Sequence, residues 1–278
     1  MKKIIITIAL TAAFTILFAA TALAVDATVD TANGSKGLVT VTLKNWDKDK
    51  DDVRIIIQKD GKNLDVFNPV KANSTIPITF GKGEYEIMVG VNMGGGRLSV
   101  KTKVKVNVSA PDEKLWYTTS NAKVDFASST KAVPNLKKLS DGKKTEREKA
   151  TPIYEYIVTN FTYDHDLASK IIAGTVTSYV PIIDTVYDMK KAICYGYSVV
   201  FAGAARNIEI PMRVVEGFVP ELVDEKTKKH ILHAWNEIYL DGKWIPIDTT
   251  FDTSLYAANK KFGLTERSRT KFEVVKTY

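Results

Sequence analysis

The stretch that decides the fold is HAWNEIYLDGKWIPID, which occupies residues 233–248. Asp241-Gly242 stands near its centre, and this dipeptide is one of the strongest signals for a two-residue hairpin turn. The flanking segments are rich in aromatic and aliphatic residues, so we predict strands across 232–251. With Asp241-Gly242 at the tip, Tyr239 lies opposite Trp244 in an antiparallel pair.

The same register brings a histidine and a carboxylate together. Continuing the pairing away from the tip puts Trp235 opposite Asp248 and His233 opposite Thr250. Because side chains alternate between the two faces of a strand, His233 and Asp248 share a face as diagonal neighbours, about 7–8 Å apart. That separation allows a hydrogen bond between imidazole and carboxylate, whereas a slip of one residue would abolish it.

Cys194 is the only cysteine of the chain, and it opens an apolar stretch that runs to Arg206. We predict a largely buried helix there, with Cys194 at its N-terminus, where the helix dipole favours a thiolate. Cysteine, histidine and aspartate are the components of a thiol acyl-transfer site. In such a site Cys194 would attack an acyl carbon, and its backbone N–H would help to hold the oxyanion. His233 would act as base and acid, while Asp248 would orient the imidazole.

Each of the three residues also has a structural explanation when taken alone. A single cysteine on an apolar helix is often a packing residue, a histidine in a strand is often structural, and an aspartate before Thr249-Thr250 often belongs to a turn or a cap. The combination favours catalysis, because a lone thiol in an exported chain is a liability unless it is buried or has a function. His165 and His230, the two other histidines, are given no role.

The first 24 residues resemble a secretion signal. Lys2 and Lys3 precede an almost wholly apolar run from Ile4 to Ala20, and Ala22-Leu23-Ala24 fits a small-residue cleavage site. We predict that residues 1–24 are a signal peptide and that the protein is secreted or held at the cell surface. An uncleaved membrane anchor is the alternative. After cleavage we expect no membrane span, because no later stretch is long and apolar enough.

The formal net charge of +7 is spread along the chain. A solvated surface explains it, although attraction to anionic components of the cell wall or cell surface is an alternative, and we do not expect nucleic acid as a partner in this compartment. We also expect no cofactor and no metal. Asp47, Asp49, Asp51 and Asp52 resemble the start of a calcium loop, but Asp52 stands where glycine is required and Gln58 where the closing glutamate belongs.

The rest of the chain divides into two regions that differ in their predicted secondary structure. Short predicted strands, at 38–43, 53–57, 76–80, 85–91 and 98–106, suggest an immunoglobulin-like β-sandwich over residues 25–110. A linker follows at Ala110-Pro111-Asp112-Glu113. Beyond it, a predicted helix over 145–159, the helix at Cys194 and an antiparallel sheet indicate an α+β domain over residues 111–278. The apolar face of the first helix comprises Ala150, Ile153, Tyr154, Ile157 and Val158.

The motifs of the second region resemble the transglutaminase-like superfamily, a papain-related fold of thiol enzymes. The resemblance covers roughly residues 116–251. The matching residues are, in order, Asn160-x-x-Tyr163-Asp164, Cys194-x-Gly196-Tyr197-Ser198, Arg206, Ile210-Pro211-x-Arg213-Val214-Val215-x-Gly217, His233-Ala234-Trp235-Asn236-Glu237 and Gly242-x-Trp244-x-x-x-Asp248-x-Thr250. The resemblance implies a papain/transglutaminase-like α+β fold with Cys194 as nucleophile, His233 as base and acid, and Asp248 as orienting group. The chain departs from the pattern at Ala192 and Glu209, where members often have glycine.

The sequence therefore predicts a secreted, thiol-dependent acyl-transfer enzyme that acts on amide bonds of peptides or proteins through a Cys-His-Asp triad and a thioester. Hydrolysis, as in a peptidase or amidase, is favoured over cross-linking, because many bacterial relatives are regarded as hydrolases. Two alternatives stay open. One is transfer of protein glutamine acyl groups to amines, which cross-links proteins, and the other is a non-catalytic binding or scaffold module at the cell surface.

Overall fold

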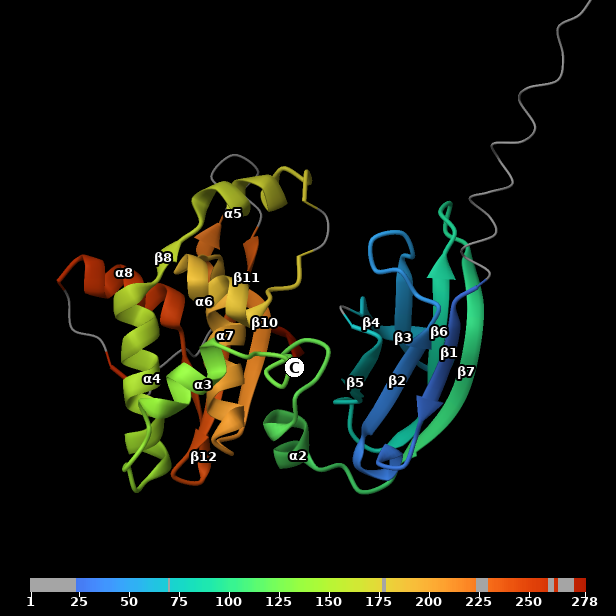
Figure 1. Cartoon of the computed structure of the whole chain (residues 1–278), viewed down its shortest axis with the longest axis horizontal. Coiled ribbons are helices and arrows are strands. Elements are labelled where there is room, and N and C mark those ends of the chain that lie inside the picture. The colour runs from blue at the N-terminus through green and yellow to red at the C-terminus, as the bar shows by residue number, and fades with distance from the viewer. Residues whose placement is uncertain (1–23, 70, 177–178, 224–229, 260–262, 265–272) are drawn as a thin grey trace, which may run out of the picture. The chain divides into compact units, whose positions relative to one another are not determined.

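The computed structural model describes residues 24–69, 71–176, 179–223, 230–259, 263–264 and 273–278. The predicted signal peptide, residues 1–24, lies outside the described residues except for Ala24. The chain divides between Pro111 and Asp112 into two compact units. In Figure 1 the first unit runs from blue to green and the second from green to red.

Two antiparallel sheets form the described part of the first unit. One has the strand order β1-β2-β5 and the other β4-β3-β6-β7. The strands are β1 (Asp26–Asp30), β2 (Leu38–Lys44), β3 (Val53–Lys59), β4 (Lys62–Phe67), β5 (Asn73–Pro77), β6 (Gly83–Asn92) and β7 (Leu98–Val108), with a short 3₁₀-helix, η1 (Gly34–Lys36). The sequence did not predict β1 and β4, and β5 begins three residues before the strand predicted at 76–80. An immunoglobulin-like sandwich stays a prediction.

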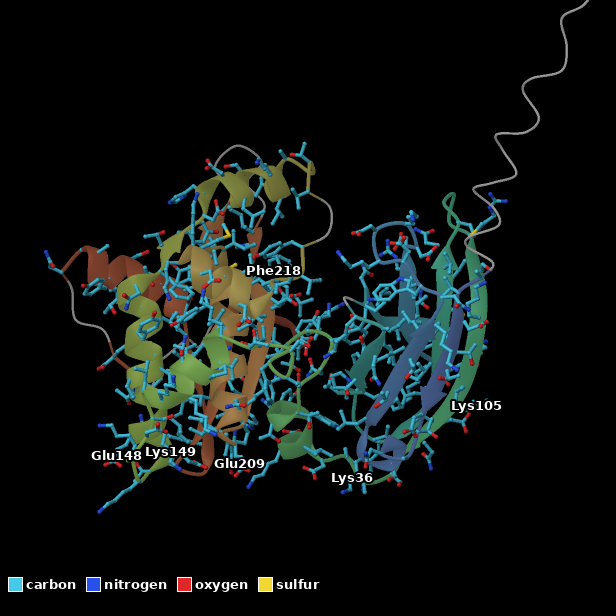
Figure 2. The ribbon with its side chains drawn as sticks, in the orientation of Figure 1. Lys36, Lys105, Glu148, Lys149, Glu209 and Phe218 are labelled. Atoms are coloured by element: carbon cyan, nitrogen blue, oxygen red, sulfur yellow. The ribbon has the colours of Figure 1, made fainter. Side chains whose placement is uncertain are left out.

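Alternation of apolar and polar residues explains why these strands form. On β3, Ile55 and Ile57 are fully buried, and on β6 Ile87 and Val89 are. On β7, Lys105, which Figure 2 labels, is exposed. It pairs with Glu84 on the neighbouring strand at 2.9 Å. The strands therefore present apolar side chains to a buried core and charged side chains to solvent. The described residues of this unit contain no cysteine or histidine.

The second unit contains helices and strands in a mixed fold. Its helices are α2 (Glu113–Thr118), α3 (Ala132–Lys138), α4 (Glu146–Asn160), α5 (His165–Ile172), α6 (Ile183–Met189), α7 (Cys194–Asn207) and α8 (Thr249–Ala257). An antiparallel sheet has the order β12-β11-β10-β13, built from β10 (Met212–Val223), β11 (His230–Leu240), β12 (Lys243–Ile247) and β13 (Glu273–Thr277). A separate parallel pair joins β8 (Thr162–Tyr163) to β9 (Lys191–Ala192). The predicted mixture of helices and an antiparallel sheet is confirmed.

Helix α7 lies at the centre of this unit (Figure 1). It packs against β10 and β11 of the sheet and against helices α3, α4 and α6. Every residue from Gly196 to Arg206 is buried, as predicted from the apolar run. A Cβ at Gly203 would lie only 2.6 Å from Ile183 Cδ1, so glycine allows the close approach of α6. The helix that carries the thiol is therefore packed between the sheet and several other helices.

Helix α4 begins and packs as its sequence predicts. Thr145 and Glu148 form a capping box: the Thr145 side chain accepts from Glu148 N, and the Glu148 side chain accepts from Thr145 N (Figure 2 labels Glu148). The five residues assigned to its apolar face are all buried. Inside this unit, Tyr154 of α4 donates a hydrogen bond of 2.6 Å to the buried carboxylate of Asp252 on α8. This bond fixes the position of α8.

The hairpin at 230–247 has the predicted register near its tip. Tyr239 pairs with Trp244, and the pairing continues to Asn236 with Ile247. Asp241 and Gly242 have φ angles of 53° and 81°, as a primed two-residue turn requires.

The prediction of a strand through residue 251 is wrong, and so is the pairing of His233 with Thr250. The strand ends at Ile247 and α8 begins at Thr249, because the Asp248 carboxylate caps this helix by accepting from Phe251 N at 3.0 Å.

Candidate active site

Cys194 is the first residue of α7, and it is partly exposed. Two neighbouring contacts fix the segment that leads into it. β9 pairs in parallel with β8, and Asp164 N donates to Ala192 O at 2.8 Å. No side chain caps the helix at Ile193. The backbone N–H of Cys194 is therefore one of the free donors at a helix N-terminus.

His233 and Asp248 are in direct contact. His233 Nε2 lies 2.8 Å from Asp248 Oδ2, and the two residues are 8% and 3% exposed. Asp248 uses its other oxygen, Oδ1, to cap α8 through Phe251 N. One carboxylate thus binds the imidazole and the helix at the same time, which fixes both its oxygens. The diagonal contact predicted from the hairpin is present, although Asp248 lies at the strand end rather than inside a strand.

The environment of His233 favours its protonated form. Burial alone opposes a charge on the imidazole, but the hydrogen bond to Asp248, a second one to Cys194, and the charges of both residues together raise the pKa of His233 to about 10. Because Nε2 faces Asp248, the nitrogen left for Cys194 is Nδ1. The structure therefore joins His233 to Asp248 by a hydrogen bond and places the pair near enough to Cys194 for the thiol to influence the imidazole.

Trp235 packs against the imidazole of His233. Its ring stacks with that of His233, with centroids 6.3 Å apart and planes inclined by 23°. Gly217 pairs with His233 across the sheet, and a Cβ at Gly217 would lie 2.2 Å from Glu273 O and 2.8 Å from the Trp235 ring. Only glycine leaves room here for β13 and for the indole. This explains why the motif of the sequence has a glycine at that position.

Asn236 connects the strand that carries the histidine to the helix that carries the thiol. It is fully buried, and its Nδ2 donates to Ser198 O at 3.0 Å and to Arg213 O at 3.2 Å. Ser198 lies one turn into α7, four residues after Cys194. The asparagine therefore links β11 to the first turns of α7 and to β10 through these two hydrogen bonds. Because His233 is on β11 and Cys194 is on α7, the hydrogen bonds help to set the distance between imidazole and thiol.

Two tyrosines beside the thiol were given no role from the sequence. Burial, followed by the charges of Cys194 and Asp164, raises the pKa of Tyr163 to about 12. Burial, followed by the charges of Asp164 and Cys194, raises the pKa of Tyr179 to about 12. Tyr163 belongs to the motif Asn160-x-x-Tyr163-Asp164, so the sequence does contain a pattern that could have identified it. Tyr179 lies in a connecting segment whose sequence carries no motif.

The described residues offer further candidate features besides the triad. His165 and His230 are both exposed. In the described ranges, no group of three or more His, Cys, Asp or Glu residues could hold a metal ion. A polar cavity of about 350 Å³ opens at the far end of α7, beside Asn207, and Figure 2 labels two of its lining residues, Lys149 and Glu209. With 14 residues in α7, it lies about 20 Å from Cys194.

Residues 135–249 match the profile of the Transglutaminase-like superfamily. This segment, which contains Cys194, His233 and Asp248, is a transglutaminase-like domain, and the resemblance carried by the motifs is confirmed. Members of this superfamily are generally enzymes, either cysteine proteases or acyltransferases.

Three solved structures are similar over part of the chain. A proposed cysteine protease from Cytophaga hutchinsonii is 17% identical, with a TM-score of 0.39, over 50% of this chain and 42% of its own. A TGase is 22% identical, with a TM-score of 0.35, over 59% and 43%. The transglutaminase of red sea bream is 12% identical, with a TM-score of 0.30, over 77% and 48%. This chain spans less than half of the length of each. No curated protein matches the sequence.

The described residues include no helix that is both long enough and apolar enough to cross a membrane.

Proposed function

We propose that this protein is a thiol-dependent acyl-transfer enzyme that acts on amide bonds of peptides or proteins. Cys194 is the nucleophile, His233 is the base and acid, and Asp248 orients the imidazole. The observation that carries the proposal is the pair of His233 and Asp248 beside the thiol: Nε2 lies 2.8 Å from Asp248 Oδ2, and Cys194 is close enough to help raise the pKa of His233. Membership of residues 135–249 in a superfamily of thiol enzymes supports it.

The reaction begins from a thiolate and an imidazolium. The sulfur of Cys194 adds to the carbonyl carbon of the amide, and the carbonyl π electrons move to the oxygen, which accepts a hydrogen bond from Cys194 N–H. When the C–N bond breaks, His233 gives its proton to the leaving nitrogen, and a thioester remains. Water, deprotonated by His233, then attacks the thioester and releases a carboxylic acid. Asp248 keeps the ring in the orientation that both proton transfers need.

Hydrolysis and transfer to an amine share this thioester. We favour hydrolysis, as in a peptidase or amidase, because water can reach a partly exposed thiol without a dedicated amine site. Cross-linking of protein glutamine remains the second outcome of the same chemistry.

We further propose that residues 1–24 direct export, which would place the enzyme outside the cytoplasm or at the cell surface. The first unit would be an immunoglobulin-like β-sandwich with no part in the chemistry. In its described residues it contributes neither a cysteine nor a histidine. Its role would be to bind a macromolecular substrate or a wall component.

Thiol labelling followed by product analysis tests the proposed function. The native protein is treated with an activity-based thiol probe, and a library of peptides and amines is then screened by mass spectrometry. We expect probe attachment at Cys194 and a free carboxylic acid as the main product. The Cys194→Ala variant is the control and should give neither. Folded wild-type protein that takes up no probe and converts no substrate would instead support a non-catalytic binding module.

A further inference from the structure

Tyr179 places its hydroxyl against the first turn of α7. A Cβ at Gly196 would lie 2.7 Å from Ala192 Cβ, so the close approach of Ala192 requires glycine, and 3.4 Å from Tyr179 Oη, which places the phenol in contact with this turn. The Tyr179 ring also packs edge-on against that of Tyr195, with centroids 6.4 Å apart. Cys194 precedes these two residues of α7. The phenol therefore lies beside the helix end that carries the thiol.

The hydroxyl of Tyr179 is available as a hydrogen-bond donor. Its pKa of about 12, raised by burial and by the charges of Asp164 and Cys194, keeps it protonated at any physiological pH. Within the described part of the chain, no residue forms a hydrogen bond with this hydroxyl, although the side chain is partly buried. A partly desolvated donor without a partner is suited to a bound ligand, because the ligand then supplies the missing hydrogen bond.

We propose that Tyr179 is a catalytic residue that binds the acyl oxygen of the substrate, opposite the backbone N–H of Cys194. The inference rests on the proposed thiol chemistry. As the bond between Sγ and the carbonyl carbon forms, the π electrons of the carbonyl move to its oxygen. Tyr179 Oη and Cys194 N each donate a hydrogen bond to this oxyanion. When the leaving group departs with the proton of His233, the electron pair returns and the carbonyl re-forms as a thioester.

Tyr163 is the alternative phenol, and its surroundings make it less suited to the task. Its ring packs edge-on against His165, with centroids 4.9 Å apart, and its backbone belongs to the parallel pair that supports Ala192. Tyr163 thus has a structural function in holding the segment that leads to Cys194. Tyr179 belongs to no described strand, and its hydroxyl lies 3.4 Å from the position of a Cβ at Gly196 in the first turn of α7.

Two small probes that react with the same sulfur separate this role from others. Attack on p-nitrophenyl acetate develops an oxyanion, whereas alkylation by iodoacetamide displaces iodide and develops none. Removing one oxyanion donor costs about 10²–10³ in kcat in a well-studied protease. We therefore expect Tyr179→Phe to lower the acetylation rate of the full-length protein at least about tenfold. Its alkylation rate should stay within about twofold, because the thiolate itself is unchanged.

Two matched variants complete the experiment. Tyr239→Phe removes a phenol hydroxyl near the hairpin tip, beside Trp244, and should change neither rate. Tyr163→Phe should affect acetylation less than Tyr179→Phe does. Tyr179→Phe keeps the aromatic ring, and equal iodoacetamide rates verify that the thiol site remains intact.

Each other outcome overturns the inference. Equal acetylation by Tyr179→Phe and wild type would show that the phenol does not bind the oxyanion, while leaving the proposed thiol chemistry in place. A parallel fall in both rates would show that Tyr179 acts on the thiolate instead. A wild-type protein that reacts with neither probe would refute the proposed function and this inference together.

Discussion

Asp248 is the residue on which two local structures depend. Its Oδ2 binds His233 and its Oδ1 caps α8. These two tasks need different properties of the side chain. The cap needs only an oxygen that accepts a hydrogen bond. The protonated histidine needs a negatively charged oxygen that accepts a hydrogen bond from its ring N–H. Substitutions at this position can therefore separate stability from catalysis.

Asp248→Asn should keep the fold and lose most of the activity. Asparagine caps helices about as well as aspartate, so α8 should still form, although loss of the buried charge beside His233 should lower the free energy of unfolding. Its amide carries no charge and offers the imidazole a competing tautomer, so turnover should fall by roughly 10²–10⁴-fold. Urea unfolding and steady-state kinetics measure the two effects. A folded variant with near-normal turnover would remove the aspartate from the mechanism.

His233→Ala should change how thiol reactivity depends on pH. In the wild type, the pKa of His233 near 10 keeps the imidazolium beside the sulfur from pH 6 to pH 9, and this positive charge should favour the reaction with iodoacetamide. A thiol without that partner ionises near pH 8.5. The variant should therefore be slowed more at pH 6 than at pH 9. Equal slowing at both pH values would mean that the imidazolium does not stabilise the thiolate.

At the scale of elements, the hairpin was predictable because its signals are local. Asp241-Gly242 specifies the turn, and alternation along β11 and β12 then fixes which side chains share a face. The end of β12 was predicted wrongly, because the threonines and phenylalanine at 249–251 have high strand propensity. The Asp248 cap and the buried bond from Tyr154 to Asp252 overrode that propensity, and the second of these is a tertiary contact.

Tyr179 marks the limit of what the sequence could predict about the site. Cys194 and His233 belong to a helix and a strand, so the apolar pattern and the hairpin turn signal were enough to predict their positions. Tyr179 reaches α7 from a connecting segment, and only the packing of that segment brings its hydroxyl to Gly196 in the first turn of the helix. No pattern of residue types encodes such an approach.

Insertion of one residue between Asp241 and Gly242 tests the register of the hairpin. The insertion should shift the pairing of β11 with β12 or widen the turn, and a shift by one residue turns the side chains of one strand to the opposite face. We expect loss of activity even where circular dichroism shows that the sheet forms. An active insertion variant with native-like spectra would contradict the register argument.

At the scale of the whole molecule, the two units should be separable in function. All three residues of the proposed triad lie in the second unit, Asp112–Tyr278. A fragment of residues 112–278 should therefore keep the alkylation rate of Cys194 and the acetylation rate with p-nitrophenyl acetate within about twofold, because each unit has its own buried core. Loss of binding to a large substrate is compatible with this division. Loss of both small-probe reactions in a folded fragment is not.

The central claim is that Cys194 forms an acyl thioester with the help of His233. Mass spectrometry of the native protein after brief exposure to p-nitrophenyl acetate measures this directly. We predict a single acetyl group, located on Cys194 by peptide mapping and released by hydroxylamine, and a much slower reaction in His233→Ala. Acetylation that falls only on lysines, or that reaches Cys194 only after denaturation, would contradict the account.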